Sequence, residues 1–148
     1  MSTSFAAPIR VLLFKPPFVD AFHLRLAIGM SLLWCDVHVL ERSNQGMRTA
    51  CAIVRSGHPV PGLILLEREA GDDVGTFHER IRHSPELEGM PLVVLGDGQD
   101  PDAERHALAA GADGFISLPT RACELARTGQ DIARFWVHHE SRERSTAG

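Results

Sequence analysis

Glu67 follows the apolar run Gly62-Leu63-Ile64-Leu65-Leu66, and its position makes it the first candidate for chemistry in this chain. An uninterrupted apolar run of this length, with turn residues on both sides, is typical of a strand buried on both faces of a parallel sheet. In open α/β sheets, ligands bind at the carboxyl ends of such strands. A carboxylate at such an end is a candidate acid, metal ligand or charge partner.

Three aspartates, Asp72, Asp73 and Asp97, lie in loops that we expect at the same edge of the sheet. They are alternative acceptors or ligands, although such residues more often cap helices or remain solvated in loops. Gly96-Asp97-Gly98 lacks the glycine spacing and the lysine of a phosphate-binding loop. No serine has the context of a nucleophile elbow, so nothing in the sequence indicates a hydrolase.

The composition is typical of one globular domain. The chain has 148 residues, of which 44% are hydrophobic and 23% charged, and its net charge is −4. A nucleic-acid-binding domain would normally carry a basic patch, and the apolar stretches are far shorter than a membrane span. The N-terminus lacks the basic and apolar regions of a secretory signal, so we expect a cytoplasmic protein.

The cysteines and histidines form no recognisable disulfide or metal pattern. Cys35, Cys51 and Cys123 are odd in number, widely spaced and flanked by apolar residues, which indicates reduced, buried thiols. No pair among the eight histidines has the spacing of a zinc site, and the adjacent His138 and His139 cannot share one face of a helix. We therefore predict no bound metal.

Apolar periodicity predicts five strands that alternate with five helices. Ser43 and Asp73 are predicted helix N-caps, and Asp100-Pro101 is a strong helix start. We expect a flexible leader over residues 1–8, one domain over 9–138 and a disordered tail over 139–148. The predicted strands cover residues 9–14, 36–40, 62–66, 91–95 and 114–118, and the predicted helices cover 18–33, 43–56, 73–84, 100–111 and 119–138.

This alternation, with short connections and right-handed crossovers, predicts a doubly wound α/β domain of three layers. The flavodoxin-like strand order 2-1-3-4-5 is the natural one for five parallel strands.

Several segments resemble the CheY-like receiver domains of response regulators. Residues 61–67 are similar to the segment that holds the phospho-acceptor aspartate of that family, and residues 81–95 to its third helix and fourth strand. Residues 109–119 resemble its fifth-strand signature. Residues 18–21 and 131–136 are similar to single-domain response regulators that partner bacterial phytochromes. Together the resemblances extend over nearly the whole chain.

The resemblance implies phosphoryl transfer from a histidine kinase to an aspartate, with Mg²⁺ held by an acidic pair and with help from a hydroxyl and a lysine. Transferred position by position, most of these groups are missing here. The acceptor position holds Glu67, the acidic pair falls on Lys15 and Pro16, the hydroxyl position is Gly96 and the lysine position is Leu118.

These replacements predict that the usual chemistry is lost. Mg²⁺ prefers oxygen ligands, and phosphoryl transfer depends on electrostatic positioning. Lys15 supplies a positive charge instead, Gly96 has no hydroxyl, and Leu118 has no charge to neutralise a phosphoryl group. The aromatic position of the family is kept as Phe115. We therefore expect neither bound Mg²⁺ nor Mg²⁺-dependent phosphorylation.

Lys15 and Glu67 end strands that are neighbours in a 2-1-3 order, about 5 Å apart. We hypothesise an ion pair that replaces the metal and its acidic cluster. In the alternative, both side chains extend into water, where a pair contributes little. Glu67 as an imitation of the phosphorylated state is a weaker hypothesis, because a carboxylate carries about one negative charge and a phosphoryl group about 1.5 to 2.

Phe135 and Trp136 are adjacent on the last predicted helix, where neighbouring side chains point about 100° apart. If one ring faces the core, the other is a candidate interface anchor. In the alternative, both rings only cover the end of the sheet. The family resemblance implies a homodimer through the face of the fourth helix, fifth strand and fifth helix.

We therefore predict a stand-alone pseudo-receiver in bacterial two-component signalling, without catalysis of its own. It would act by binding, as a homodimer or on a histidine kinase, a phytochrome-type sensor or a downstream protein. The chain ends soon after the last predicted helix, so we expect no DNA-binding output domain. Two alternatives stay open: a receiver phosphorylated on Glu67 or a nearby aspartate, and a small-ligand sensor that uses the same cleft.

Overall fold

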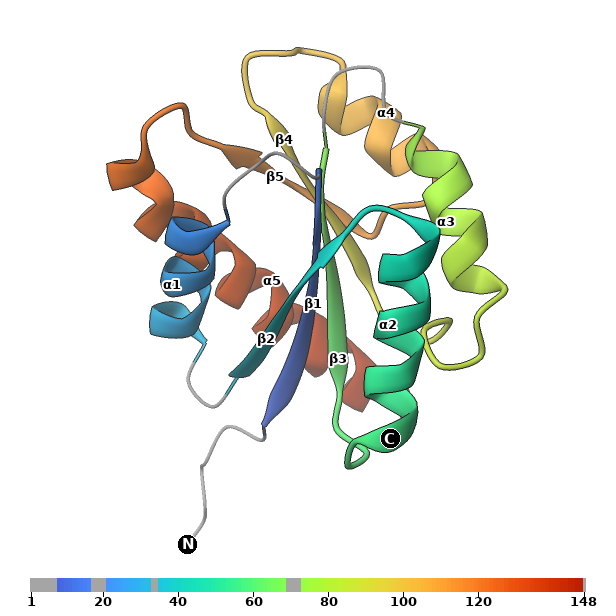
Figure 1. The fold of residues 1–148 in the computed structure, drawn as a ribbon. Helices are drawn as coiled ribbons and strands as arrows, with labels where there is room; N and C mark the ends of the chain where they lie inside the picture. Colours follow the sequence, from blue (N-terminus) through green and yellow to red (C-terminus); the bar gives the residue numbers. More distant parts are fainter. Residues whose placement is uncertain (1–7, 17–20, 33–34, 69–72, 148) are drawn as a thin grey trace, which may run out of the picture.

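The fold is a five-stranded parallel sheet between two layers of helices (Figure 1). The computed structural model describes residues 8–16, 21–32, 35–68 and 73–147, with the backbone alone at residue 122 and at 144–147. In these residues the strand order is β2-β1-β3-β4-β5, and all four strand pairs are parallel. The predicted doubly wound α/β fold and its 2-1-3-4-5 order are thus confirmed.

All five strands lie where the apolar runs predicted them. Helices α1 and α5 lie on one side of the sheet, and α2, α3 and α4 lie on the other (Figure 1). The strands are β1 (Ile9–Lys15), β2 (Cys35–Glu41), β3 (Gly62–Glu67), β4 (Leu92–Asp97) and β5 (Gly114–Leu118). The helices are α1 (Phe22–Ser31), α2 (Asn44–Ser56), α3 (Val74–Arg82), α4 (Ala103–Ala109) and α5 (Leu125–Ala147), the last preceded by the 3₁₀ turn η1 (Ala122–Glu124).

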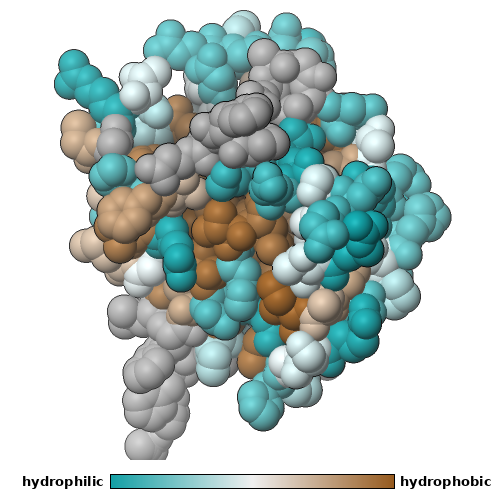
Figure 2. Space-filling view, in the orientation of Figure 1, coloured by the Kyte–Doolittle hydropathy of each residue, from teal (hydrophilic) through white to brown (hydrophobic). Residues whose placement is uncertain are grey.

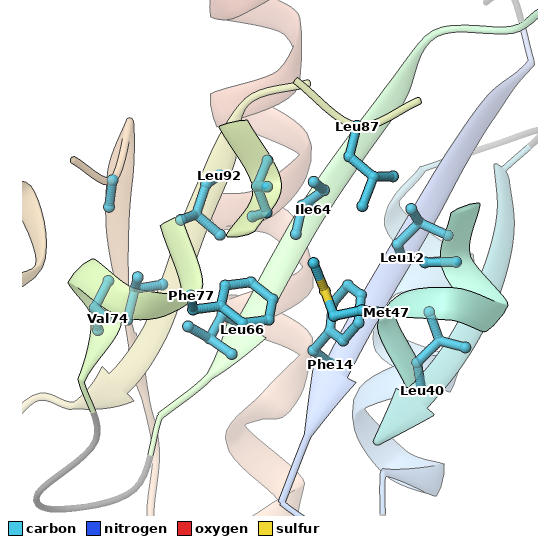
Figure 3. Close-up of a cluster of buried hydrophobic side chains, with 14 of the residues drawn as sticks. Leu12, Phe14, Leu40, Met47, Ile64, Leu66, Val74, Phe77, Leu87 and Leu92 are labelled. Carbon is cyan, nitrogen blue, oxygen red and sulfur yellow. The ribbon is translucent and has the colours of Figure 1, made fainter. Parts of the chain in front are cut away.

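Each face of the sheet carries its own hydrophobic core, because successive side chains of a strand point to opposite faces. On the α2–α4 side, the rings of Phe14 and Phe77 meet edge to face with centroids 5.0 Å apart (Figure 3). On the α1–α5 side, Leu13 and Leu65 pack with Ile132 and Trp136 of α5. The interior strands are therefore apolar on both faces, which is why they appear in the sequence as continuous runs.

The predicted caps of α2 and α3 are confirmed. Ser43 accepts a hydrogen bond of 3.0 Å from the backbone N–H of Gly46, and Asp73 accepts one of 3.1 Å from that of Thr76. Each bond satisfies an amide that has no partner inside its helix. As predicted for α3, its buried positions are Val74, Phe77 and Ile81.

The start of α4 differs from the prediction. Asp100-Pro101 was expected to open the helix, but α4 begins at Ala103. The Asp100 side chain instead accepts a hydrogen bond of 3.0 Å from the N–H of Asp102. This local turn competes with the helix for the same backbone. The predicted end is correct, since Gly111 follows α4 with φ of 112°, a conformation that favours glycine.

Helix α5 differs at both ends. It begins at Leu125, after η1, and not at Pro119. It continues to Ala147, so the predictions of an end near His138 and of a disordered tail are wrong through Ala147. No proline or glycine interrupts residues 139–147, and their charges of alternating sign suit an exposed helix surface.

Two other predictions fall partly outside the described residues. The leader over residues 1–8 is described only at Pro8. The predicted start of the first helix, residues 18–20, is also outside, and α1 ends at Ser31. None of the described helices combines the length and the apolarity needed to cross a membrane.

Candidate functional site

The carboxyl ends of β1 and β3 form the centre of the candidate site. Phe14 of β1 aligns with Leu66 of β3, so the next residues, Lys15 and Glu67, end neighbouring strands. Both follow residues whose side chains enter the α2–α4 core, so alternation directs both side chains to the α1–α5 side. Lys15 also aligns with Glu41 of β2. The structure thus brings together the strand ends that the strand order predicted, while the Lys15–Glu67 ion pair itself stays a prediction.

A lysine and a proline stand where the resemblance would require two carboxylates. Lys15 is half-buried, and its ammonium donates a hydrogen bond of 3.2 Å to the carbonyl oxygen of Pro16, which is itself buried. The Pro16 carbonyl therefore already accepts a hydrogen bond from the neighbouring Lys15 ammonium. A divalent cation at this place would meet the positive charge of Lys15 directly, which is unfavourable.

Gly96 and Phe115 form a contact that the sequence did not reveal. A Cβ atom added at Gly96 would lie 2.8 Å from Cε2 and 3.1 Å from Cζ of the Phe115 ring. The ring is half-buried and packs against the core on the α2–α4 side. The aromatic side chain therefore occupies the space that a side chain at the hydroxyl position would need.

Ser117 is a hydroxyl that sequence reasoning missed at this edge. It is exposed, and its backbone aligns with that of Gly96 across β4 and β5. Its Oγ atom would lie 2.7 Å from a Cβ at Gly98, so it covers the loop that follows β4. Its place in an expected strand was known from the sequence, but which residue of β4 it faces depends on the register between the strands.

Leu118 packs against the core on the α1–α5 side and aligns with Asp97 of β4. Its side chain is half-buried and apolar, so the lysine position of the family contributes hydrophobic contact here and no charge.

Asp73 and Asp97 at this edge accept hydrogen bonds from nearby backbone N–H groups. Asp73 accepts a second hydrogen bond, of 2.6 Å, from the Thr76 hydroxyl, and these bonds from Thr76 hold the pKa of Asp73 below its ordinary value. Asp97 is exposed and accepts a hydrogen bond of 2.8 Å from the N–H of Gln99. The cap interpretation of Asp73 is confirmed, whereas Asp72 lies outside the described residues.

The residues present do not suit a Mg²⁺ site. In the described part of the chain, no group of three or more histidine, cysteine, aspartate or glutamate side chains is arranged to hold a metal ion. The donors that Mg²⁺ prefers are carboxylate, carbonyl and water oxygens. The two positions that the resemblance assigns to the metal-binding carboxylates hold Lys15 and Pro16 instead.

The two adjacent aromatic side chains of α5 both pack against the core on the α1–α5 side, but to different depths. Trp136 is 7% exposed and belongs to the core on the α1–α5 side. Phe135 is half-buried, lies over Gly114 of β5 and stacks on His139 with ring centroids 6.0 Å apart. Of the two interface candidates, Phe135 is therefore the ring that contacts the core and is also partly exposed at the surface.

Phe135 also lines a depression of about 690 Å³ on the surface formed by α4, β5 and α5. Leu108 of α4, which is 45% exposed, and Phe115 line the same depression. Charged side chains of both signs surround them, including Glu104 and Arg134. We call these residues and their elements the α4–β5–α5 face.

The three cysteines form no disulfide and are free. Cys35 and Cys51 are half-buried, and burial raises the pKa of both thiols, so they stay protonated near neutral pH. Cys123 is exposed, so the prediction that all three are buried is wrong there.

The fold has many relatives among solved structures, although no protein-family model and no curated protein matches the sequence. The phosphorylated cyanobacterial phytochrome response regulator RcpA is similar at 22% identity and a TM-score of 0.64, over 88% of this chain and 95% of that one. The Mn²⁺-bound response regulator Rcp1 is similar at 21% identity and a TM-score of 0.62, over 87% and 94%. This chain has the receiver fold.

A third relative is response regulator RPA3017, which acts in red light signalling of R. palustris. It is 16% identical, with a TM-score of 0.63, over 87% of this chain and 93% of that one. At such identities the shared feature is the fold, and function must be argued from the site.

Proposed function

We propose that this protein is a pseudo-receiver: a receiver-like module of two-component signalling that works by protein–protein binding and is not phosphorylated in the Mg²⁺-dependent way. The observation that carries the proposal is the half-buried Lys15, whose ammonium is held by the Pro16 carbonyl at the end of β1. In a phosphorylatable receiver, this position would supply carboxylates to the metal. The proposal also includes a cytoplasmic location.

The Gly96–Phe115 contact supports the same proposal. A receiver needs a side chain at the Gly96 position to hold the transferred phosphoryl group, and here the Phe115 ring lies across that position. With Gly96 at the hydroxyl position and Leu118 at the lysine position, neither position supplies the group that the resemblance assigns to it. The surface for binding is then set by packing and not by a bound phosphoryl group.

Incubation with acetyl phosphate and Mg²⁺, followed by intact-mass measurement, tests the absence of phosphorylation. A receiver with a complete acidic site, treated in parallel, should gain the mass of one phosphoryl group, and this protein should gain none. An adduct would overturn the proposal. Fragmentation would then show whether it sits on Glu67 or on an aspartate such as Asp97, as the alternative function predicts.

The α4–β5–α5 face is the surface that we propose for binding, to a second copy or to a sensor kinase, a phytochrome-type sensor or a downstream protein. Exposed Leu108 and half-buried Phe135 supply its apolar area. Leu108→Glu should convert the dimer to a monomer in sedimentation velocity. Met30→Glu is the matched control, because Met30 of α1 is 80% exposed, does not line the depression of this face and should leave the dimer intact.

A further inference from the structure

Helices α2 and α3 are separated by an open groove of about 960 Å³ that the proposed function does not use. The two helices run side by side on the same side of the sheet (Figure 1). The groove extends from Asn44 to Arg55 on α2, about 16 Å at 1.5 Å per residue, and from Thr76 to Glu86 on and after α3. It is therefore three helical turns long, and it contains no residue of the α4–β5–α5 face.

The floor of the groove is apolar. Met47 extends from α2 into the core and closes the groove from below (Figure 3). Cys51 lies one turn further along α2 and packs on the same core. Burial raises the pKa of its thiol, so the floor carries no charge there. Ala52 and Pro85 add further apolar surface.

The rim of the groove is rich in arginine, and the side of the molecule over α2 and α3 is hydrophilic (Figure 2). Arg48 donates a hydrogen bond of 2.8 Å to the side-chain oxygen of Gln45, and Arg80 crosses from α3 to the side-chain oxygen of Asn44. Both acceptors are neutral amides, so these bonds orient the guanidinium groups and leave their charges in place.

The other charges on the rim partly cancel. Arg55 pairs with Glu86 at 3.3 Å, and His83 lies 3.3 Å from Glu79. Three arginines therefore face two glutamates here, in a chain whose net charge is −4. The groove is locally cationic on a molecule that is anionic as a whole, and such a surface selects a partner of negative charge.

The shape indicates which kind of anion fits. A long groove that is open to solvent along its length would leave a small ligand largely exposed, whereas ligand pockets bury most of a ligand's surface. An amphipathic helix laid between two helices buries one apolar stripe and leaves its flanking side chains at the rim. Carboxylates at the flanks would meet guanidinium groups, which bind them bidentately.

We propose that the α2–α3 groove binds an acidic amphipathic helix of a partner protein, whose apolar side chains rest on Met47 and Cys51 and whose carboxylates pair with Arg48 and Arg80. On binding, each guanidinium exchanges a neutral amide oxygen for a carboxylate. This surface lies apart from the α4–β5–α5 face, so the proposal does not depend on the proposed function.

The test is selection of a displayed library of helical peptides, about 18 residues long so that they can form helices, on the folded protein. Their helix surfaces are randomised with acidic, basic, neutral and apolar residues. Peptides with one apolar stripe flanked by Asp and Glu should be enriched. No enrichment, or enrichment without regard to charge, would overturn the proposal.

Two variants of equal charge change then locate the binding of the strongest selected peptide. Arg48→Glu/Arg80→Glu reverses the charge of two arginines at the groove. Arg25→Glu/Arg105→Glu reverses the charge of two exposed arginines elsewhere, on α1 and α4. In fluorescence anisotropy, the groove variant should weaken binding at least tenfold and the control less than twofold, with both melting temperatures near that of the wild type. Equal weakening by the two variants would show non-specific attraction and would reject the groove.

If the groove variant does not fold, Ala52→Glu serves in its place. Ala52 is exposed on the groove floor, so a carboxylate there should repel the acidic peptide without disturbing the core. Binding as tight as that of the wild type would reject the groove as the site.

Discussion

The two faces of the sheet are covered in different ways. On one face, α1 and α5 are in direct contact: an added Cβ at Gly129 would lie only 2.4 Å from the carbonyl oxygen of Ala27. On the other face, α2 and α3 are separated by the groove with Met47 and Cys51 on its floor. Both faces have a complete core beneath, but the depression between α1 and the start of α5 is only about 290 Å³, against about 960 Å³ for the groove between α2 and α3.

The difference shows that helices can bury the core of a sheet without packing tightly against one another. A small residue on α5 lets two helix backbones approach, and the contact leaves only a small depression between α1 and the start of α5. Arginine side chains on α2 and α3 cover the helices and remain solvated, so a partner can displace the water between them. Binding surfaces are therefore expected where helices stay apart over an intact core.

The contact between α1 and α5 should be sensitive to added volume. Gly129→Ala would press a methyl group against the backbone of α1, which cannot move as a flexible side chain does, and we expect a loss of about 2 kcal/mol in the free energy of unfolding. Gly29→Ala on α1 is the control. Nothing lies within 4 Å of its added Cβ, so higher helix propensity should stabilise the protein by up to about 1 kcal/mol.

Urea denaturation measures both changes. If both substitutions change the free energy of unfolding equally, the contact between α1 and α5 is not tight, because the two helices can then move apart without loss of stability.

Gly96→Thr tests how tightly the core under the α2–α4 side is filled. The new side chain would collide with the Phe115 ring, whose outer end can rotate away, so we expect a loss of about 1 kcal/mol. The same substitution should cost less when Phe115 is replaced by alanine. A double-mutant cycle measures this coupling, and additive effects would mean that the ring does not occupy the Gly96 position.

Lys15→Met tests the predicted ion pair at the edge of the α1–α5 side. Removal of the ammonium leaves Glu67 without that partner, and we expect a loss of about 1 kcal/mol, near the upper end for a partly exposed pair. Lys15→Arg keeps the charge and should cost less. If Lys15→Met changes neither the stability nor the binding of a partner, the pair has no role.

The smallest effect concerns the cap of α3, which holds one wall of the groove. The Thr76 hydroxyl is the first cause of the lowered pKa of Asp73, so Thr76→Val should raise that pKa towards its ordinary value. NMR titration of the Asp73 carboxyl carbon measures the change. A pKa that does not rise would show that the hydroxyl bond is absent in solution.

The direction of the pH dependence follows from that shift. Because the pKa of Asp73 is lower in the folded than in the unfolded chain, its stabilisation is complete above the unfolded value and is lost as the pH falls through the folded value. On acidification, the wild type should therefore lose more stability than Thr76→Val. The opposite order would contradict the assignment of Asp73 as an ionised cap.

Several features of the site were available from the sequence because they depend on residue identity. The residue types at Glu67, Lys15, Gly96 and Leu118, from which we proposed the loss of phosphorylation, can be read directly from the sequence. The caps at Ser43 and Asp73 were also predictable, since a cap and the amides it accepts from lie within one turn. The length of α5 was missed because its polar last turns have the composition of a tail.

Other features depend on contacts between distant segments. How deeply Phe135 and Trp136 are buried depends on the rotation of α5 against the sheet. The Gly96–Phe115 contact depends on the register of β4 and β5. The groove depends on the distance between α2 and α3, which no local pattern encodes.

By itself, the sequence determined the sheet, its order and the residues at its productive edge. Interior parallel strands are apolar on both faces, so each one can be recognised as a continuous run of apolar residues, such as the run that precedes Glu67. Only the tertiary structure decided which surfaces close and which stay open. That outcome follows from how the side chains of several elements fill the same space, and no single segment contains that information.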